Sequence, residues 1–332
     1  MTPERANAGL QRALLIGTGS IGRRHLANLR ALAPGVQVDV LREGRPGPLP
    51  EFDATLSTTL DEALAKSPQL VIVATPTSAH LRYLQAAIAA GIAFYAEKPV
   101  VGSAAELDAL EATCRGHRMP PNIVGCNLRF LPSLHRLREL VRDGALGNIA
   151  RASFECGQWL PDWRPAQDYR QGYSARAELG GGVALDLIHE IDAARWVLGE
   201  LRVLCAVSAR NSALEISSSD TAAYLLQAER GALASVQVDY VARRATRRYR
   251  IVGDQATADW DLPARTLTLS DVAGTRAIDL PADAFDVAGT YVTAMSELLA
   301  AIVAGTPTSQ PLEEGMRSLR IALQAHTSPT SA

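Results

Sequence analysis

Three glycines near the N-terminus, spaced G-x-G-x-x-G within ALLIGTGSIGRRHLANLRAL (residues 13–32), constrain the fold more than any other feature of the sequence. The apolar run before them predicts a strand, and the amphipathic segment after them predicts a helix. In such a turn Gly17 permits the tight bend, Gly19 lets the backbone approach a ligand and Gly22 lets helix and strand pack closely. The free N–H groups and positive dipole end of the helix favour phosphate groups. The residues expected around a dinucleotide pyrophosphate are Gly17, Gly19, Ser20, Ile21 and Gly22.

Strand and helix signals alternate through the first third of the chain, which predicts βαβ units and a doubly wound parallel sheet. Beyond it, helices are predicted at 133–147 and within 178–200, then short strands between 201 and 280, then two final helices. Successive strands without intervening helices favour an antiparallel sheet. We therefore expect an α/β protein with an N-terminal Rossmann domain over residues 1–124. An α+β domain with a large open antiparallel sheet would cover 125–332, its last helix packing back on the first domain.

Composition and charge exclude several classes of partner for this 332-residue chain. A net charge of −2 gives no electrostatic footprint for nucleic acid. The polar N-terminus lacks the apolar core of a signal peptide, and no apolar run reaches the ~18 residues of a membrane helix. The four cysteines are far apart and match no metal or redox spacing. We expect a cytoplasmic protein with a small-molecule substrate and no nucleic-acid, membrane or metal partner.

The end of the second predicted strand, VDVLREGR (residues 38–45), bears on which dinucleotide binds. An acidic residue that binds the adenosine ribose normally stands there, but this chain has Arg42, with Glu43 next and Arg45 close behind. Asp39 falls inside the strand, too early to reach the ribose. Because an arginine at the strand tip accepts a 2′-phosphate and stacks on adenine, NADP(H) is favoured. NAD(H) stays open if the strand ends one residue later and Glu43 takes the ribose role.

Two further stretches carry groups suited to proton and charge transfer. In FYAEKPV (residues 94–100), Lys98 follows a strand and places a cation at the carboxyl edge of the sheet, where ligands of such folds bind. Asp186, His189 and Asp192 are spaced by three residues, which places them near one face of a predicted helix. A carboxylate beside an imidazole orients the ring and raises its basicity, so the pair is suited to acid–base catalysis.

These stretches together resemble the glucose–fructose oxidoreductase / inositol 2-dehydrogenase / rhizopine-catabolism (Gfo/Idh/MocA) family. GTGSIGRRH, VIVATPTSAH, AEKPV, VGCNLRF, GGGVALDLIHEID and PLEEGMRSLR follow the family's order over nearly the whole chain. The resemblance implies an NAD(P)-dependent oxidoreductase of carbohydrate metabolism that acts on a CH–OH group of a sugar, a cyclitol or a derivative. It also implies a homodimer or homotetramer that pairs through the C-terminal sheet.

The resemblance also implies roles for single residues. Lys98 would hydrogen-bond the reacting hydroxyl, and His189 would be the acid/base, with Asp186 orienting it or relaying the proton. The family usually has three residues between that Asp and that His, and here only two intervene. Both spacings share a helix face, but a rotated histidine would leave Asp186 or Asp192 as the proton carrier. The further cofactor-binding residues implied are Arg42, Glu43, Ala74, Thr75, Pro76, His80, Glu97, Lys98 and Asn127.

A segment rich in Trp, Tyr and Arg (residues 157–182) precedes the predicted catalytic helix and shows little helix or strand period. We interpret it as a loop aimed at the substrate, because arginines bind carboxylate or phosphate by paired hydrogen bonds and aromatic rings stack on sugars. A structural loop or subunit contact is the alternative. The loop is similar to a subgroup linked to nonulosonate and surface-polysaccharide pathways, which implies a sugar acid or nucleotide sugar. The candidate substrate-binding residues are Arg129, Trp163, Arg164, Tyr169, Arg170 and Asp192.

Three functions remain open from the sequence. The first is a sugar or cyclitol dehydrogenase that transfers a hydride between nicotinamide and substrate. The second is a redox-neutral enzyme that oxidises transiently, then eliminates, epimerises or cleaves a glycoside, and reduces again. The third is a non-enzymatic dinucleotide-binding regulator, which is disfavoured because Lys98 and His189 are both present.

Overall fold

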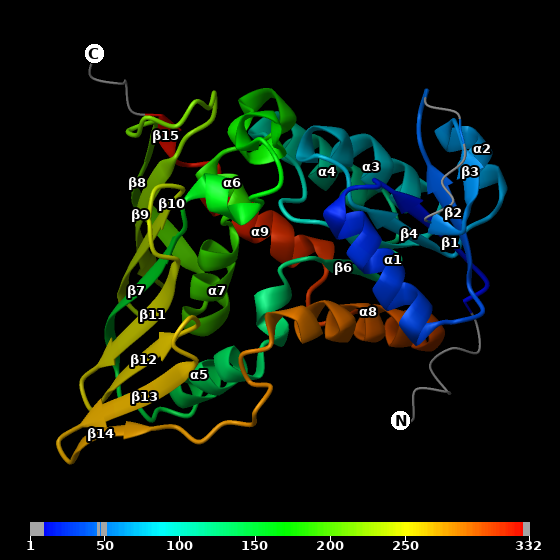
Figure 1. Cartoon of the computed structure of the whole chain (residues 1–332). Helices are drawn as coiled ribbons and strands as arrows, with labels where there is room; N and C mark the ends of the chain where they lie inside the picture. The colour runs from blue at the N-terminus through cyan, green and yellow to red at the C-terminus, as the bar shows by residue number, and fades with distance from the viewer. Residues whose placement is uncertain (1–9, 45–46, 48–51, 328–332) are drawn as a thin grey trace. The chain divides into compact units, whose positions relative to one another are not determined.

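The computed structural model describes residues 10–44, 47 and 52–327 of the chain. These residues form two compact units. The first unit contains the residues up to Asn127 together with Ala288–Met316. The second unit contains Leu128–Val287 and the residues from Arg317 onward. The path of the chain through both is drawn in Figure 1.

The first unit is built on six parallel strands in the order β3-β2-β1-β4-β5-β6, which confirms the predicted doubly wound sheet. The short edge strand β3 was not predicted from the sequence. The strands are β1 (Arg12–Ile16), β2 (Gln37–Leu41), β3 (Thr55–Ser57), β4 (Leu70–Val73), β5 (Ala93–Ala96) and β6 (Asn122–Val124). The helices are α1 (Ser20–Leu32), α2 (Leu60–Ala65), α3 (His80–Ala89), α4 (Ala104–Gly116), α8 (Val287–Ala304) and the start of α9 (Leu312–Ala322).

Two helices of this unit begin at residues whose hydroxyl side chains cap the first turn. The Thr59 side chain accepts a hydrogen bond from the N–H of Glu62 at the start of α2. The Ser103 side chain accepts one from Glu106 at the start of α4. Both hydroxyls satisfy N–H groups that a helix leaves free in its first turn. α1 lies on one face of the sheet, and α3 and α4 lie on the other (Figure 1).

Helix α8 corrects the expectation that no segment is long and apolar enough for a membrane span. It has 18 residues with a mean hydropathy of 1.6, so it meets that criterion by length and composition. Thr290 and Glu297 interrupt its apolar runs, but the mean hydropathy of the helix stays high enough to meet the criterion. Core helices of folded domains pass the same test, and Met295 and Leu298 of α8 are buried. The Glu297 carboxylate accepts a hydrogen bond of 2.9 Å from the Ser309 hydroxyl.

The second unit is built on a nine-stranded sheet in the order β14-β13-β12-β11-β7-β10-β9-β8-β15. The predicted large open sheet is confirmed, but it is mixed, because β7 pairs parallel with β10 and β15 pairs parallel with β8. The strand β7 comes earlier in the chain than both of its neighbours in the sheet, β11 and β10, an arrangement that short hairpins do not produce. The strands are β7 (Ile149–Gly157), β8 (Leu201–Ala209), β9 (Thr221–Ala228), β10 (Leu233–Asp239), β11 (Thr246–Gly253), β12 (Thr257–Asp261), β13 (Thr266–Asp271), β14 (Gly274–Ala277) and β15 (His326–Thr327).

One face of this sheet is covered by helices α5 (Pro132–Arg142) and α7 (His189–Leu198) (Figure 1). The alternation of buried and exposed residues along β9 and β10 follows from the two-residue period of a strand. The uncovered face carries Val207, Leu225 and Leu233, whose exposed fractions are 40–44%. Sizeable apolar side chains on a sheet face are the kind of surface that a partner covers.

Candidate active site

The glycine turn after β1 requires glycine at two of its three positions. Gly17 has φ +109°, and a Cβ there would lie 2.3 Å from the carbonyl oxygen of Ala74. A Cβ on Gly22 would lie 2.0 Å from the carbonyl oxygen of Gly17. Both approaches are far inside van der Waals contact, so these glycines allow β1, β4 and α1 to pack closely.

Gly19 has a different environment, because nothing lies within 4 Å of the Cβ that it lacks. It is the N-cap of α1, with an ordinary φ of −70°, and no side chain caps the helix. The first turn of α1, which begins with Ser20 and Ile21, has no acidic residue. No neighbour among the residues that the structure describes therefore requires glycine here. Open space in front of uncapped N–H groups fits a dinucleotide pyrophosphate.

This contrast predicts the effect of Gly19→Ala. Folding stability is expected to change by less than about 1 kcal/mol, because the backbone and the space both accept alanine. Affinity for the dinucleotide is expected to fall about 10- to 100-fold, because the methyl group blocks a charged hydrogen-bonded partner. Calorimetric titration with NAD⁺ and NADP⁺ measures the affinity. Gly35→Ala is the matched control, since its Cβ would also meet nothing within 4 Å but lies before β2; equal affinities in both variants would contradict the prediction.

Two charged residues, Arg42 and Glu43, follow the end of β2, and the Glu43 carboxylate is paired with another side chain. β2 ends at Leu41, and the N–H of Arg42 donates to the Ser57 carbonyl at 3.0 Å. Among the residues that the structure describes, the Arg42 side chain makes no ion pair. Glu43 is paired with Arg82 and accepts a hydrogen bond of 3.1 Å from Tyr83. Arg45 lies outside the described residues.

Asp39 lies within β2, as the sequence predicts, and its side chain is buried. Its carboxylate pairs with Arg12 at 2.8 Å and with Lys66 at 3.1 Å. It is therefore neutralised inside the sheet and has no role at the strand tip.

The carboxyl end of β5 leads to Lys98 through a buried carboxylate. Glu97 Oε1 lies 2.6 Å from Nε2 of His25, which is fully buried on α1. Burial alone would raise the pKa of Glu97, but the hydrogen bond and charge of His25 and the charge of Lys98 lower it below its ordinary value. Glu97 is therefore an anion whose carboxylate accepts a hydrogen bond from the imidazole. The His25 ring packs 4.3 Å from that of Tyr95, which fixes its orientation.

His80 ties the loop after β4 to the loop after β5. Its two ring nitrogens lie 2.9 Å from the Thr75 carbonyl oxygen and 3.0 Å from that of Pro99. Burial lowers the pKa of His80, and the two carbonyls and the charge of Glu97 oppose this only in part. The segment Ala74–Pro76 and Lys98 thus belong to loops that one buried side chain holds. Separately, the buried amide of Asn127 donates to the Thr290 hydroxyl at 2.6 Å.

The predicted catalytic helix is broken in the second unit, which corrects the expectation of one continuous helical face. Asp186 ends the short helix α6 (Val183–Asp186), Leu187 leaves helical geometry with φ −100° and ψ 33°, and His189 begins α7. His189 is half-buried, and Asp186 is buried. Asp186 Oδ2 accepts hydrogen bonds from Tyr240 at 2.9 Å and from Ser174. These donors belong to β-sheet and loop segments, so the backbone follows them rather than the helical period.

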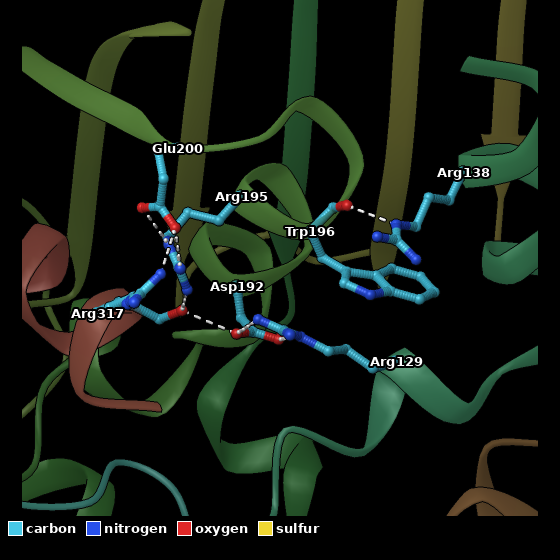
Figure 2. Close-up of polar contacts among 8 residues, drawn as sticks. Arg129, Arg138, Asp192, Arg195, Trp196, Glu200 and Arg317 are labelled. Carbon is cyan, nitrogen blue, oxygen red and sulfur yellow. Dashed lines mark hydrogen bonds and ion pairs between the residues drawn. The ribbon is translucent and has the colours of Figure 1, made fainter. Parts of the chain in front are cut away.

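Asp192 and Arg129 bind each other (Figure 2). Arg129 donates from Nε to Asp192 Oδ2 at 2.8 Å and from Nη2 to Oδ1 at 2.7 Å, with both side chains buried. The Ser318 hydroxyl donates to the same carboxylate at 2.8 Å and accepts from Arg195 at 2.9 Å. A paired and buried carboxylate of this kind anchors the first turns of α7. The assignment of Asp192 and Arg129 to substrate binding stays a prediction, and these contacts favour a structural role.

The network in Figure 2 continues toward the end of α7. Arg195 donates to Glu200 at 2.7 Å, and Arg317 donates to the same carboxylate at 3.2 Å. Glu200 has a lowered pKa because of the hydrogen bonds from Arg195, which outweigh its partial burial. Arg138 lies over the ring of Trp196 and donates to its carbonyl at 2.8 Å. Both ends of α7 are thus fixed by charged side chains.

The arginines of the aromatic loop differ in what they bind. Arg170 pairs with Asp168 at 2.9 Å and with Glu215 at 3.0 Å. Arg164 is exposed and makes no ion pair within the described part of the chain. It lines a shallow hollow with Trp163 and Tyr169. Arg164 is therefore better placed than Arg170 to meet an anion from solution.

Three side chains at these sites escaped the sequence reading: His25, Ser174 and Tyr240. His25 stands three residues after Gly22 in the glycine stretch, so its position was visible but its partner was not. Ser174 and Tyr240 are 12 and 54 residues from Asp186, and no local pattern relates them to it. In the part of the chain that the structure describes, no group of three or more His, Cys, Asp or Glu side chains is arranged to hold a metal ion.

Family models match both parts of the chain. The oxidoreductase family with NAD-binding Rossmann fold matches residues 11–120, and the GFO/IDH/MocA C-terminal domain matches residues 134–259. Rhizopine catabolism protein MocA of Rhizobium meliloti is 30% identical over 194 residues, which are 56% of this chain and 56% of that protein. D-apiose dehydrogenase of Paraburkholderia graminis is 31% identical over 210 residues, which are 62% of this chain and 52% of that protein.

The match to these two relatives spans about half of their length. The structure of a levoglucosan dehydrogenase in complex with NADH has the same fold, with a TM-score of 0.81 and 21% identity over 94% of this chain and 95% of that one. Both family models describe the parts of one kind of protein, in the order found here. The chain belongs to the GFO/IDH/MocA family of oxidoreductases with an NAD-binding Rossmann domain.

Proposed function

We propose that the protein is an NAD(P)-dependent dehydrogenase or reductase that acts on a CH–OH group of a sugar, a cyclitol, a sugar acid or a nucleotide sugar. The observation that carries this proposal is the glycine turn, in which Gly17 packs against Ala74 of the loop after β4 and Gly19 faces open space. The activity of a relative, a dehydrogenase of D-apiose, supports the substrate class. Residues 1–124, with Asn127, would serve the cofactor, and the rest of residues 125–332 the substrate and the oligomer.

In this mechanism the chain holds the dinucleotide at the glycine turn, Ala74–Pro76 and Asn127. The bound nicotinamide supplies a hydride acceptor or donor. The Lys98 ammonium donates a hydrogen bond to the reacting oxygen and stabilises the negative charge that develops there. His189 takes the hydroxyl proton during oxidation and returns it during reduction, with Asp186 orienting the imidazole.

The finer cofactor assignment is NADP(H), with NAD(H) as the alternative. Arg42 at the β2 tip supports it, because a guanidinium without an ion-pair partner can accept a 2′-phosphate. The pairing of Glu43 with Arg82 supports it further, since that carboxylate is already neutralised. An affinity for NAD⁺ more than tenfold above that for NADP⁺ would contradict this assignment.

An anionic group on the substrate is proposed to meet Arg164. The side chain is exposed beside Trp163 and Tyr169, and a guanidinium binds carboxylate or phosphate with paired hydrogen bonds. Arg170 is the contrasting residue, because Asp168 and Glu215 already balance its charge.

We also propose a cytoplasmic homodimer or homotetramer that pairs through the uncovered sheet face. Val207, Leu225 and Leu233 on that face supply an apolar surface that a second copy would bury. Light scattering at micromolar concentration measures the mass, and a monomer would contradict the assembly.

A substrate panel with NADP⁺ and NAD⁺ tests the proposed activity. The panel holds free sugars, inositols, sugar acids and nucleotide sugars, and the absorbance of reduced nicotinamide is the signal. Reduction of the cofactor by one substrate class, with preference for anionic members, is the expected result. A wild-type protein that binds the cofactor but oxidises no member would overturn the dehydrogenase and favour redox-neutral chemistry.

A further inference from the structure

The carboxylate of Asp186 is held by two hydroxyl groups from distant segments. Tyr240, which follows β10, donates to Oδ2 at 2.9 Å, and Ser174 of the aromatic loop donates to the same oxygen. Exposed fractions are 0% for Tyr240, 8% for Ser174 and 7% for Asp186. Two donors on one buried oxygen restrict the carboxylate to a single orientation.

The two donors are themselves fixed. The N–H of Tyr240 donates to the Asp220 carbonyl at 2.8 Å, and its ring meets the edge of Trp163 with 5.3 Å between ring centroids. The Ser174 carbonyl accepts a hydrogen bond of 2.7 Å from the Ser218 hydroxyl. A Cβ on Gly181 would lie 2.9 Å from that carbonyl oxygen, so glycine there lets the loop pack this closely. The same loop therefore carries both the candidate substrate-binding side chains and a donor to Asp186.

We propose that Ser174 and Tyr240 are positioning residues, which hold the Asp186 carboxylate in the orientation on which His189 depends. This inference rests on the proposed dehydrogenase function. It makes Asp186 an oriented acceptor beside the start of α7, because its Oδ2 receives two hydroxyl donors. It also makes the aromatic loop part of the support for catalysis, beyond any contact with substrate.

The tyrosine hydroxyl is suited to permanent donation. Burial raises the pKa of Tyr240, and the charges of Asp186 and Tyr173 raise it further. The phenol therefore keeps its proton at any pH of interest. Tyr240 is the titratable donor on this carboxylate that lies opposite α7, and Tyr173 lies close enough to Tyr240 to act on its pKa.

The first test is Tyr240→Phe, with Ser174→Ala as a second variant, assayed on the substrate found in the panel. Each is expected to lower kcat about tenfold, with KM for the cofactor within about twofold, because a hydrogen bond to a charged group is lost. Tyr224→Phe is the matched control, since this buried tyrosine also loses one hydrogen bond, of 2.9 Å, to the Ala322 carbonyl. A kcat within twofold of wild type in Tyr240→Phe, or an equal loss in Tyr224→Phe, would overturn the proposal.

The second test needs no substrate, so it separates this inference from the proposed function. NMR titration follows the His189 ring in wild type and in Tyr240→Phe, with His189→Gln assigning the signal. Loss of the phenol leaves more of the carboxylate charge to act on the imidazolium, so the midpoint is expected to rise by about half a pKa unit. A fall in the midpoint would mean that the Asp186 carboxylate turns away from His189 once the hydroxyl is lost. That result would also show that the Tyr240 hydroxyl holds the carboxylate in place. An unchanged midpoint in both positioning variants would overturn the proposal even if the enzyme is inactive on every sugar.

Discussion

Replacing Lys98 with methionine is expected to lower kcat by about 10²- to 10³-fold, because the hydroxyl oxygen loses a preorganised cation that stabilises its developing charge. Methionine keeps the length of the side chain and removes the ammonium. The affinity for the dinucleotide is expected to change little, because the glycine turn is untouched. Steady-state absorbance of reduced nicotinamide gives kcat, and calorimetric titration gives the cofactor affinity.

The composition of the chain provides a control for this variant. Lys98 and Lys66 are its two lysines. Lys66 pairs with Asp39 at 3.1 Å inside the sheet, so Lys66→Met removes the same ammonium from a structural site. The kcat of Lys66→Met is expected to stay within about twofold of wild type, since a substitution outside the active site leaves transition-state binding unchanged. A Lys98→Met enzyme that keeps more than about a tenth of wild-type kcat would remove Lys98 from the mechanism.

The first unit was predictable because its signals are local. The glycine turn, the capping hydroxyls of Thr59 and Ser103 and the apolar strands each act over a few residues. Strand order then follows from the right-handed connections of βαβ units. The edge strand β3 (Thr55–Ser57) was missed, because three residues carry too little periodicity.

The second unit was less predictable because distant contacts override local pattern. Asp186, His189 and Asp192 have helical spacing, yet the helix breaks after Asp186, whose side chain bonds to Ser174 and to Tyr240. A prediction from helical spacing holds only if the helix is continuous. Here the helix is broken where the Asp186 side chain forms tertiary hydrogen bonds.

Charged residues illustrate the same limit. The sequence identified Arg129, Asp192 and Arg170 as polar groups suited to a substrate. It did not reveal that Arg129 and Asp192 pair across 63 residues, or that Arg170 lies between Asp168 and Glu215. Partner choice depends on the packing of helices and loops, which no local pattern encodes. Arg164 can be distinguished from the paired arginines as a candidate anion-binding residue only once those pairings are known.

Replacing Arg247 with methionine is expected to lower the free energy of unfolding by about 3–5 kcal/mol, because it leaves an unpaired charge beneath α7. Glu190, the residue after His189, is fully buried and lies 2.7 Å from Arg247 Nε. It also accepts a hydrogen bond of 3.1 Å from Tyr249. A neutral hydroxyl cannot compensate a buried carboxylate that has lost its cation. Urea denaturation followed by tryptophan fluorescence measures the loss, and Trp260 in this unit is a buried reporter.

Strand β11 supplies the control for this prediction. Arg250 lies on the same strand and pairs with Asp259 at 2.5 Å, but its side chain is 55% exposed. Arg250→Met is expected to cost no more than about 1 kcal/mol, since solvent screens an exposed ion pair. Removing both charges, in Glu190→Leu with Arg247→Met, is expected to recover most of the loss, because desolvation of an ion pair offsets much of its attraction. Equal losses of unfolding free energy in Arg247→Met and Arg250→Met would contradict the prediction. They would mean that water reaches Glu190 in the folded protein and that no desolvated ion pair stabilises α7.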